Sequence, residues 1–211
     1  MNSEEKRILT GVSGLAVLII VMDQLLKYWV RVHIGDGPNI QVTNWFYLCF
    51  VQNNGMAFGI TLFNKIFLTL FRVVAVAGLI YLICYEVRKK YSLGFVVGSA
   101  LILGGATGNI IDCLFYGVLF NEGAFCYGKV VDMFYFPLIQ GTWPDWFPFW
   151  SGEPFVFFRP VFNLADSAIT CGVFYLLIFK NKELARLFSD SDHSSKENKE
   201  EKSENDKENN N

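Results

Sequence analysis

Four stretches of the chain are apolar over a length that suits a bilayer crossing, which takes about 20 residues. Charged side chains inside them are few, and they include Asp23, Arg72 and Asp166. The first stretch has no small-residue cleavage site and is followed by further apolar stretches, so it does not resemble a cleaved signal peptide. The pattern predicts four transmembrane helices, at about 8–27, 66–86, 92–112 and 161–180.

The segments that flank these stretches differ in their basic residues, and this difference predicts the orientation. Lys and Arg gather before the first helix, between the second and third, and after the fourth. Such segments stay on the cytoplasmic side of a membrane. We therefore expect both termini in the cytoplasm and the loops 32–63 and 117–160 outside. All five tryptophans fall on that outer side: Trp29, Trp45, Trp143, Trp146 and Trp150.

Aromatic residues dominate the outer loops, and tryptophan prefers the headgroup layer of a membrane. Residues 44–51 (NWFYLCFV) are β-prone and predict a short sheet resting on the membrane. Residues 143–158 are interrupted by Pro and Gly, which favours an interfacial loop, with a re-entrant helix as the alternative. The expected fold class is an all-α integral membrane protein. It has four transmembrane helices, a small sheet on the outer face and an interfacial loop or helix.

Composition agrees with one membrane domain and an appended tail. Hydrophobic residues make up 52% of the 211 residues and charged residues 18%, whereas about 25% charged is usual in soluble domains. Residues 190–211 hold eight acidic residues and four lysines, so the tail is acidic and the remainder slightly basic. No basic stripe is available for nucleic acid. We expect a membrane domain over 1–180 and a disordered cytoplasmic tail over 181–211.

The five cysteines do not form a metal-binding pattern, because the chain has no CxxC pair and only two histidines. Cys84 and Cys171 fall inside apolar stretches, where a free cysteine packs as a small apolar residue. Cys49 and Cys126 both fall in the expected outer loops. A disulfide between them therefore stays open as an alternative.

Four carboxylates are expected at one depth, near the outer surface. Asp23 lies about 22 Å from the start of the first helix and Asp112 about 30 Å from the start of the third, at 1.5 Å per residue. Asp166 lies five residues into the last stretch, and Asp132 lies in the second outer loop. An ionisable residue inside a span costs about 3 kcal/mol or more, so each is a functional candidate.

Some of these carboxylates have partners close in sequence. Asn109 lies three residues before Asp112, and Asp23 lies four before Lys27, so each pair shares a helix face. The alternative for such pairs is that they only hold the helices together.

Asp132 and Asp166 have no basic partner close in sequence, although Asn163 lies three residues before Asp166. Two carboxylates that share one proton can activate water with one member and protonate the reacting amide with the other. Because like charges close together resist ionising together, such a pair keeps one proton. This is aspartic-protease chemistry, and it needs no metal and no cofactor.

Other intramembrane protease chemistries fit the sequence less well. The zinc-protease motif HExxH is absent. Residues 11–14 (GVSG) match the GxSG of rhomboid-type serine proteases, but a serine needs a general base. The two histidines, His33 and His193, are expected far from Ser13. The GxGD motif of presenilin-like proteases is also missing.

Five motifs occur in order between residues 23 and 169. They are Asp23-Gln24-Leu25-Leu26-Lys27; Asn53-Asn54-Gly55-Met56-Ala57-Phe58; Gly104-Gly105-Ala106-Thr107-Gly108-Asn109-Ile110-Ile111-Asp112; Val130-Val131-Asp132-Met133; and Phe162-Asn163-Leu164-Ala165-Asp166-Ser167-Ala168-Ile169. In this order and topology they resemble the five blocks of lipoprotein signal peptidase, the bacterial signal peptidase II.

The resemblance implies an aspartic endopeptidase that cleaves diacylglyceryl-modified prolipoproteins just before the lipidated cysteine. It implies a location in the bacterial cytoplasmic (inner) membrane with the active site at the outer face. The implied fold has four transmembrane helices, a β-cradle and a periplasmic helix. The implied partners are prolipoproteins, membrane lipids and globomycin-type inhibitors, with no nucleic acid, and we expect a monomer.

The resemblance also implies residue roles. Asp132 and Asp166 would form the catalytic pair, without a metal or cofactor. The residues that would line or support the site are Asp23, Lys27, Asn53, Gly55, Ala57, Phe58, Gly108, Asn109, Asp112, Asn163 and Ala165.

Two departures from the family pattern stand out. Cys113 follows Asp112 where the family usually has Arg, so a cation beside the site is lost or supplied from elsewhere. The interval before Asp166 is lengthened by an insert at about 139–158, rich in Trp, Phe and Pro. One hypothesis is that this insert is a lid over the substrate, in which case deleting 141–154 would change the kinetics.

Two rival functions use the same intramembrane carboxylates. A small transporter or channel would use them as a cation path, but it would spread them over several depths. A structural membrane subunit would use them to hold helices together, and it would tolerate Asp→Asn changes.

Overall fold

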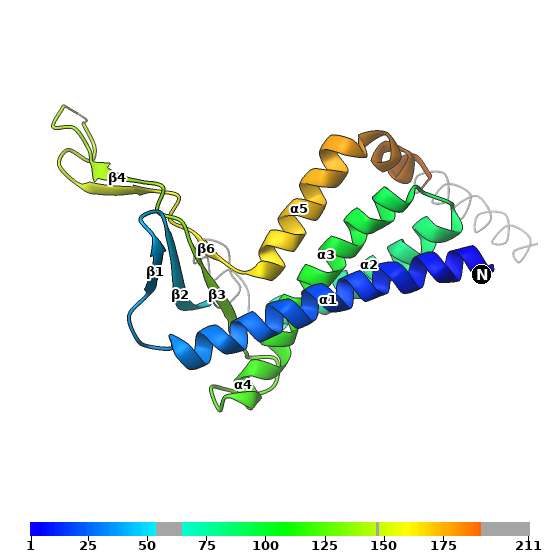
Figure 1. Cartoon of the computed structure of the whole chain (residues 1–211), viewed down its shortest axis with the longest axis horizontal. Helices are drawn as coiled ribbons and strands as arrows, with labels where there is room; N and C mark the ends of the chain where they lie inside the picture. The colour runs from blue at the N-terminus through cyan, green and yellow to red at the C-terminus, as the bar shows by residue number, and fades with distance from the viewer. Residues whose placement is uncertain (54–64, 147, 191–211) are drawn as a thin grey trace, which may run out of the picture.

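The computed structural model describes residues 1–53, 65–146 and 148–190. Its long helices run side by side, and its strands gather at the end of the molecule farthest from the N-terminus (Figure 1). The principal helices are α1 (Ser3–His33), α2 (Lys65–Arg88), α3 (Leu93–Ile111) and α5 (Leu164–Phe179).

Local sequence fixes where these helices begin. Asn2 and Glu5 form a capping box at the start of α1, and the Ser92 side chain caps α3. Helix α3 passes directly into a π-helical turn, η2 (Asp112–Tyr116), and a short α4 (Gly117–Leu119). Single π-turns inside helices are rare and often occur at functional sites.

Three helical segments are long and apolar enough to cross a membrane: α1, α2 and the continuous run Leu93–Leu119. Helix α5 passes the same test only together with the helix Asn181–Asp190, which is bent from it by 91°. By itself α5 has 16 residues and reaches about 24 Å, less than the ~30 Å of a hydrocarbon core. The described chain therefore has three candidate membrane spans, or four if the bent pair is one span.

The start of the last helix differs from the sequence prediction. Residues Val161–Phe162 form strand β6, and the helix begins at Leu164 because Asn163 caps it with its side chain. The expected tail also begins later than residue 181, because Asn181–Asp190 is helical. Its remainder, 191–211, lies outside the described residues.

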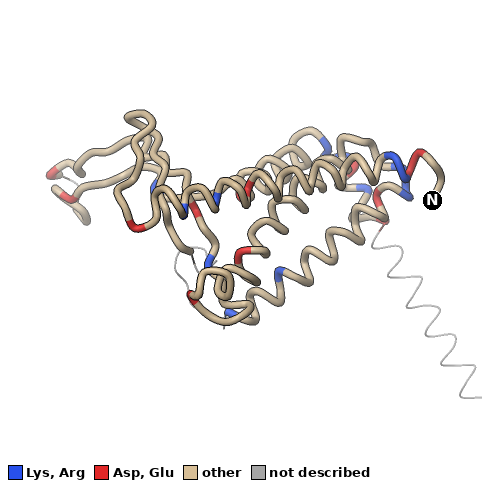
Figure 2. Tube along the Cα trace, turned by 60° about the horizontal axis from the view of Figure 1, so that its bottom comes forward, with Lys and Arg blue, Asp and Glu red and all other residues tan. Residues whose placement is uncertain are grey.

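The helices carry their apolar side chains outward and their polar ones inward, as a lipid environment requires. Large apolar side chains such as Leu25, Phe71 and Phe174 are exposed on the helix surfaces. Figure 2 shows Lys and Arg gathered at the helix ends near the N-terminus. This distribution matches the basic segments that predicted the orientation.

Helix α3 lies at the centre of the bundle, packed against α1, α2 and α5. Two glycines permit the close approach. A Cβ atom at Gly108 would lie 2.8 Å from Oδ2 of Asp23, and one at Gly105 would collide with the carbonyl oxygen of Ala165. Small residues at helix contacts are typical of membrane bundles. Here they bring α1, α3 and α5 together at the depth of the predicted site.

An antiparallel sheet at the outer end of the bundle has the strand order β1-β2-β3-β6. The all-α class is therefore incomplete, although the expected sheet over 44–51 is confirmed. Asp132 on β3 pairs with Val51 on β2, and Phe134 pairs with Phe162 on β6. The strands are β1 (Ile40–Thr43), β2 (Phe46–Asn53), β3 (Val130–Tyr135) and β6 (Val161–Phe162).

A second pair of strands makes a hairpin from the aromatic insert. Strands β4 (Ile139–Thr142) and β5 (Pro154–Phe157) pair in antiparallel register, with Ile139 opposite Phe157. The re-entrant helix considered for 143–158 is wrong for the described residues, which form turns and strand. Proline and glycine interrupt this segment too often for a helix.

Candidate active site

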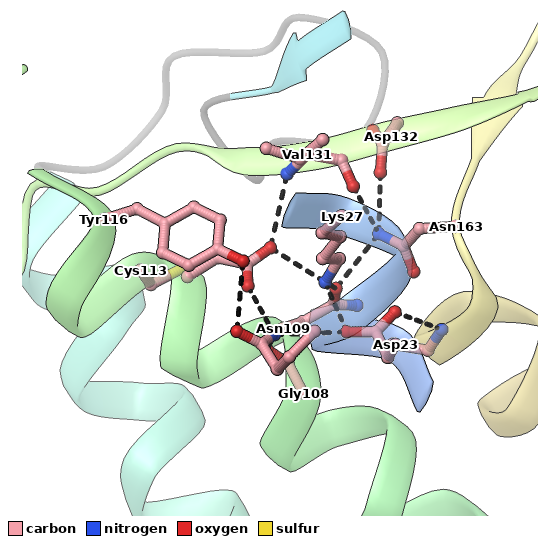
Figure 3. Close-up of polar contacts among 12 residues, drawn as sticks. Asp23, Lys27, Gly108, Asn109, Cys113, Tyr116, Val131, Asp132 and Asn163 are labelled. Carbon is pink, nitrogen blue, oxygen red and sulfur yellow. Dashed lines mark hydrogen bonds and ion pairs between the residues drawn. The ribbon is translucent and has the colours of Figure 1, made fainter. Parts of the chain in front are cut away.

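A lysine between two carboxylates forms the centre of the polar interior (Figure 3). The Nζ atom of Lys27 lies 2.7 Å from Oδ2 of Asp23 and 2.7 Å from Oδ2 of Asp112. It also donates to Oδ1 of Asn109 at 2.9 Å. These three acceptors match the three N–H groups of an ammonium. All three charged side chains are 0% exposed.

Gln24 completes this cluster, and the sequence prediction did not select it. Its Nε2 donates to Oδ1 of Asp112 at 2.8 Å and to the carbonyl of Gly108 at 3.1 Å. Its Oε1 accepts from the Tyr116 hydroxyl at 3.0 Å. The only feature of the sequence that could have pointed to Gln24 is its position beside Asp23 in an apolar stretch. Its partners lie more than 80 residues away, so the sequence alone did not identify its role.

The same carboxylates connect the cluster to the elements around it. Oδ1 of Asp23 accepts from the backbone N–H of Ala165 at 2.9 Å, at the start of α5. Oδ2 of Asp112 accepts from the backbone N–H of Val131 on β3 at 3.2 Å. The buried cluster therefore joins α1, α3, α5 and the sheet at one point.

Two asparagines connect this cluster to the other pair of carboxylates. The Nδ2 of Asn163 donates to Oδ1 of Asp132 at 2.7 Å and to Oδ1 of Asn109 at 3.0 Å. The Nδ2 of Asn109 donates to Oδ1 of Asp166 at 2.7 Å. Asp132 and Asp166 are thus held by adjacent amides.

Each member of this second pair has a further hydrogen bond. Oδ2 of Asp132 accepts from Nδ2 of Asn53, on β2, at 3.2 Å. Oδ2 of Asp166 accepts from the backbone N–H of Asn163 at 3.4 Å, as part of the capping box that starts α5. Local helix capping therefore fixes the Asp166 side chain, while the strand register fixes that of Asp132.

The electrostatic environment of Asp132 favours its protonated form. The side chain is only 3% exposed. Burial, followed by the nearby Asp166 carboxylate, raises the pKa of Asp132 from 3.8 to about 7. Hydrogen bonds from Asn53 and Asn163 act in the opposite direction without cancelling the shift. A carboxyl group with this pKa can hold or release a proton near neutral pH.

The structure brings together most of the residues that the sequence selected. Asp132 and Asp166 lie at the junction of β3 with α5, beside the buried cluster. Gly55, Ala57 and Phe58 lie outside the described residues. The selected residues that the described network joins are Asp23, Lys27, Asn53, Gly108, Asn109, Asp112, Asn163 and Ala165, the last through its backbone N–H.

A cation does lie beside Cys113, the position where the expected arginine is absent. Nη1 of Arg72, on α2, donates to Sγ of Cys113 at 3.0 Å. Arg72 was noted in the sequence only as a charge within an apolar stretch. Cys49 and Cys126 are both free cysteines, so the disulfide alternative is wrong for this structure.

The arrangement is that of two acid groups held by amides beside a buried lysine that two further carboxylates share, at the end of a membrane bundle. A family model described as signal peptidase (SPase) II matches residues 15–181. The chain belongs to the signal peptidase II family. This signal peptidase is therefore an aspartic-type peptidase, and family membership decides against the transporter and structural alternatives.

Relatives of this signal peptidase extend over most of its length. A lipoprotein signal peptidase of Porphyromonas gingivalis is 48% identical over 183 residues, covering 79% of this chain and 81% of the relative. One from Amoebophilus asiaticus is 39% identical and covers 81% of this chain and 78% of the relative. A solved bacterial membrane enzyme aligns with a TM-score of 0.61 at 25% identity, covering 84% of this chain and 91% of that one.

Proposed function

We propose that this signal peptidase removes the signal peptide from diacylglyceryl-modified prolipoproteins, cutting before the lipidated cysteine with Asp132 and Asp166. The observation that carries the proposal is the amide bridge between these two side chains. Asn163 donates to Asp132, and Asn109 donates to Asp166, while Asn163 donates to Asn109. The names of the relatives support the class of substrate.

In this mechanism the two carboxyl groups share one proton. The ionised member takes a proton from water, whose oxygen attacks the scissile carbonyl. The protonated member donates its proton to the carbonyl oxygen, which gives a tetrahedral diol. The proton taken from water then passes to the leaving amine as the C–N bond breaks, and the diol returns one proton to the pair as the product carboxyl group forms. The raised pKa of Asp132 supports a proton on the pair at neutral pH. In a coupled pair the proton belongs to both groups, so neither Asp is assigned a fixed role.

The supporting residues keep the pair in this geometry. Asn53, Asn109 and Asn163 orient the carboxyl oxygens, because an amide N–H can donate to either ionisation state. The buried Lys27 cluster holds α1, α3 and α5 together beneath them. Gly108 permits the close approach of Asp23, and the Ala165 backbone N–H donates to Oδ1 of Asp23, which fixes the start of α5 against α1.

The topology we propose places the active site at the outer face of the bacterial cytoplasmic membrane. The basic segments keep both termini in the cytoplasm, so the sheet lies outside. In this orientation α5 and the bent helix after it serve as the fourth crossing. The acyl chains of the substrate then stay in lipid between helices, and its peptide lies along the sheet near Asn53. The enzyme acts as a monomer and is inhibited by globomycin-type peptides.

The test is cleavage of a synthetic prolipoprotein peptide by purified enzyme in detergent, with and without the diacylglyceryl group on its cysteine. Product masses identify the cleaved bond. We expect cleavage of the lipidated peptide alone, and at least about a 100-fold loss in Asp132→Asn and Asp166→Asn, the range for a lost acid or base. Asp36→Asn, an exposed aspartate, is the matched control. Near-normal rates in either site variant would refute the mechanism.

A further inference from the structure

The β4–β5 hairpin exposes large apolar side chains to an unusual degree. Trp146 and Phe149 are each 79% exposed. Trp150 is about half exposed, and Phe157 slightly more than half. Aromatic side chains of this size have about 150–250 Å² of surface each, so together they expose an area at the upper end of the largest apolar patch on a typical soluble monomer. A surface of this kind indicates an interaction site.

The hairpin obtains little stability from the rest of the molecule. Among the described elements, β4 and β5 pack chiefly against each other. Ring contacts within the turn, such as Trp143 with Trp150 at 5.8 Å and with Phe155 at 5.2 Å, hold its shape. An isolated two-stranded hairpin is marginal in water and needs an apolar surface against which to pack.

The position of the hairpin favours lipid over substrate as that surface. It leaves the sheet beyond Tyr135, on the side away from Asp132, and Figure 1 shows it running across the direction of α5. A segment that crosses the direction of α5 at this end of the bundle can extend along the membrane surface. A lid over the Asp132–Asp166 pair would require it to fold back over the sheet.

The charges of the hairpin point to the same partner. Between Leu138 and Phe158 the only charged residues are Asp145 and Glu153. Figure 2 likewise shows acidic positions near the tip of the hairpin. Attachment through anionic headgroups requires Lys or Arg, which this segment lacks. Tryptophan and phenylalanine with few charges match the aromatic belt that membrane proteins place at the headgroup layer.

We propose that the tip of the β4–β5 hairpin, carrying Trp146, Phe149 and Trp150, inserts into the headgroup layer of the outer leaflet as an aromatic anchor. The anchor binds lipid through its aromatic rings and is indifferent to headgroup charge. It holds the sheet, and with it β3, at a constant height above the bilayer. This role is additional to peptide cleavage and does not depend on how the two aspartates work.

The direct test uses enzyme in lipid nanodiscs, which leave both membrane faces accessible. The contribution of Trp146 is obtained by subtracting the tryptophan fluorescence of the Trp146→Phe variant from that of the wild type. We expect phosphatidylcholine brominated near the headgroup to quench most of this component, and aqueous iodide to quench little of it. The result is expected to be the same when anionic lipid is added. Quenching by iodide alone, or quenching that requires anionic lipid, would overturn the proposal.

A second measurement separates a lipid anchor from a lid. The double variant Trp146→Ser/Phe149→Ser should lose hydrogen-exchange protection over 139–157 in nanodiscs, while Asp145→Ser, in the same turn, should keep it. In detergent we expect the double variant to retain kcat/KM within about twofold, since its side chains do not contact substrate. A large loss of kcat/KM in detergent would assign the hairpin to the substrate, as a lid, and refute the anchor.

Discussion

Two groups of aspartates lie side by side in this protein, and they differ in the groups that donate hydrogen bonds to their carboxyl oxygens. Asp23 and Asp112 share the ammonium of Lys27, with both contacts at 2.7 Å. Within the part of the chain that the structure describes, Asp132 and Asp166 accept hydrogen bonds from neutral groups, chiefly the amides of three asparagines. The first pair has a charged partner in the Lys27 ammonium, whereas an amide N–H can donate to a carboxyl group in either ionisation state. The first group is therefore suited to holding the bundle together and the second to acid–base chemistry.

Removing the shared cation should have the largest effect on stability. Lys27→Met leaves two buried carboxylates without their counter-charge, so we expect a loss of about 3–5 kcal/mol. Unfolding in detergent, followed by circular dichroism, measures it. Lys182→Met, at an exposed lysine, is the control. If the two variants are equally stable, the Lys27 cluster does not hold the bundle.

Removing a neutral member of the cluster should cost less. Gln24→Ala leaves Oδ1 of Asp112 and the Tyr116 hydroxyl without their present partner. Buried groups left unpaired cost about 1–3 kcal/mol. The same unfolding measurement applies, with the exposed Gln41→Ala as the comparison. A loss as large as that of Lys27→Met would show that charge pairing is not what distinguishes the cluster.

A substitution among the amides should affect activity more than stability. Serine caps helices about as well as asparagine, so Asn163→Ser keeps the start of α5. It removes the amide that donates to Asp132 and to Asn109. We expect kcat to fall at least about tenfold, because the carboxyl group of Asp132 loses the amide that orients it. The free energy of unfolding should fall by no more than the about 1–3 kcal/mol of a buried group left unpaired. Asn163→Ala removes the helix cap as well as the amide. It should melt at a lower temperature than Asn163→Ser, and this difference separates the loss of the cap from the loss of the amide.

The pH dependence of stability should also distinguish the two groups of aspartates. The pKa of Asp132 is 3.8 in an ordinary setting and about 7 in the folded protein. Between these values the folded state keeps a proton that the unfolded state has lost, so stability falls as pH rises. Asp132→Asn should remove this contribution. We expect wild type to lose melting temperature relative to the variant from pH 4 to pH 7, and parallel curves would contradict the assignment.

Contacts between candidate site residues that are close in sequence could be predicted from spacing, whereas contacts between distant segments could not. Asp23 and Lys27 are one helical turn apart, and Asn163 and Asp166 form a capping box, so these relations depend on local spacing. The sharing of Lys27 with Asp112 joins α1 to α3 and depends on tertiary packing. The roles of Gln24 and Arg72 depend on the same packing, which explains why spacing alone did not reveal them.

The fold shows the same division between local and tertiary information. Long apolar stretches predicted α1, α2 and α3, because bilayer thickness dictates their length. The last helix was placed three residues too early, because strand pairing of Val161 and Phe162 with β3 overrides their apolar character. The hairpin of the insert was expected as a loop, since its strands are short and its pairing partners lie across an 11-residue turn region rich in aromatics.

In the proposed division of roles, Asp132 and Asp166 catalyse while Asp23 and Asp112 hold the fold. The most direct measurement compares melting temperature and kcat on the lipidated peptide in Asp23→Asn, Asp112→Asn, Asp132→Asn and Asp166→Asn. We predict that the last two variants melt no lower than wild type and lose at least about 100-fold in kcat, while the first two melt at lower temperatures. Activity retained in Asp132→Asn or Asp166→Asn, or a lowered melting temperature shared by all four variants, would contradict the division.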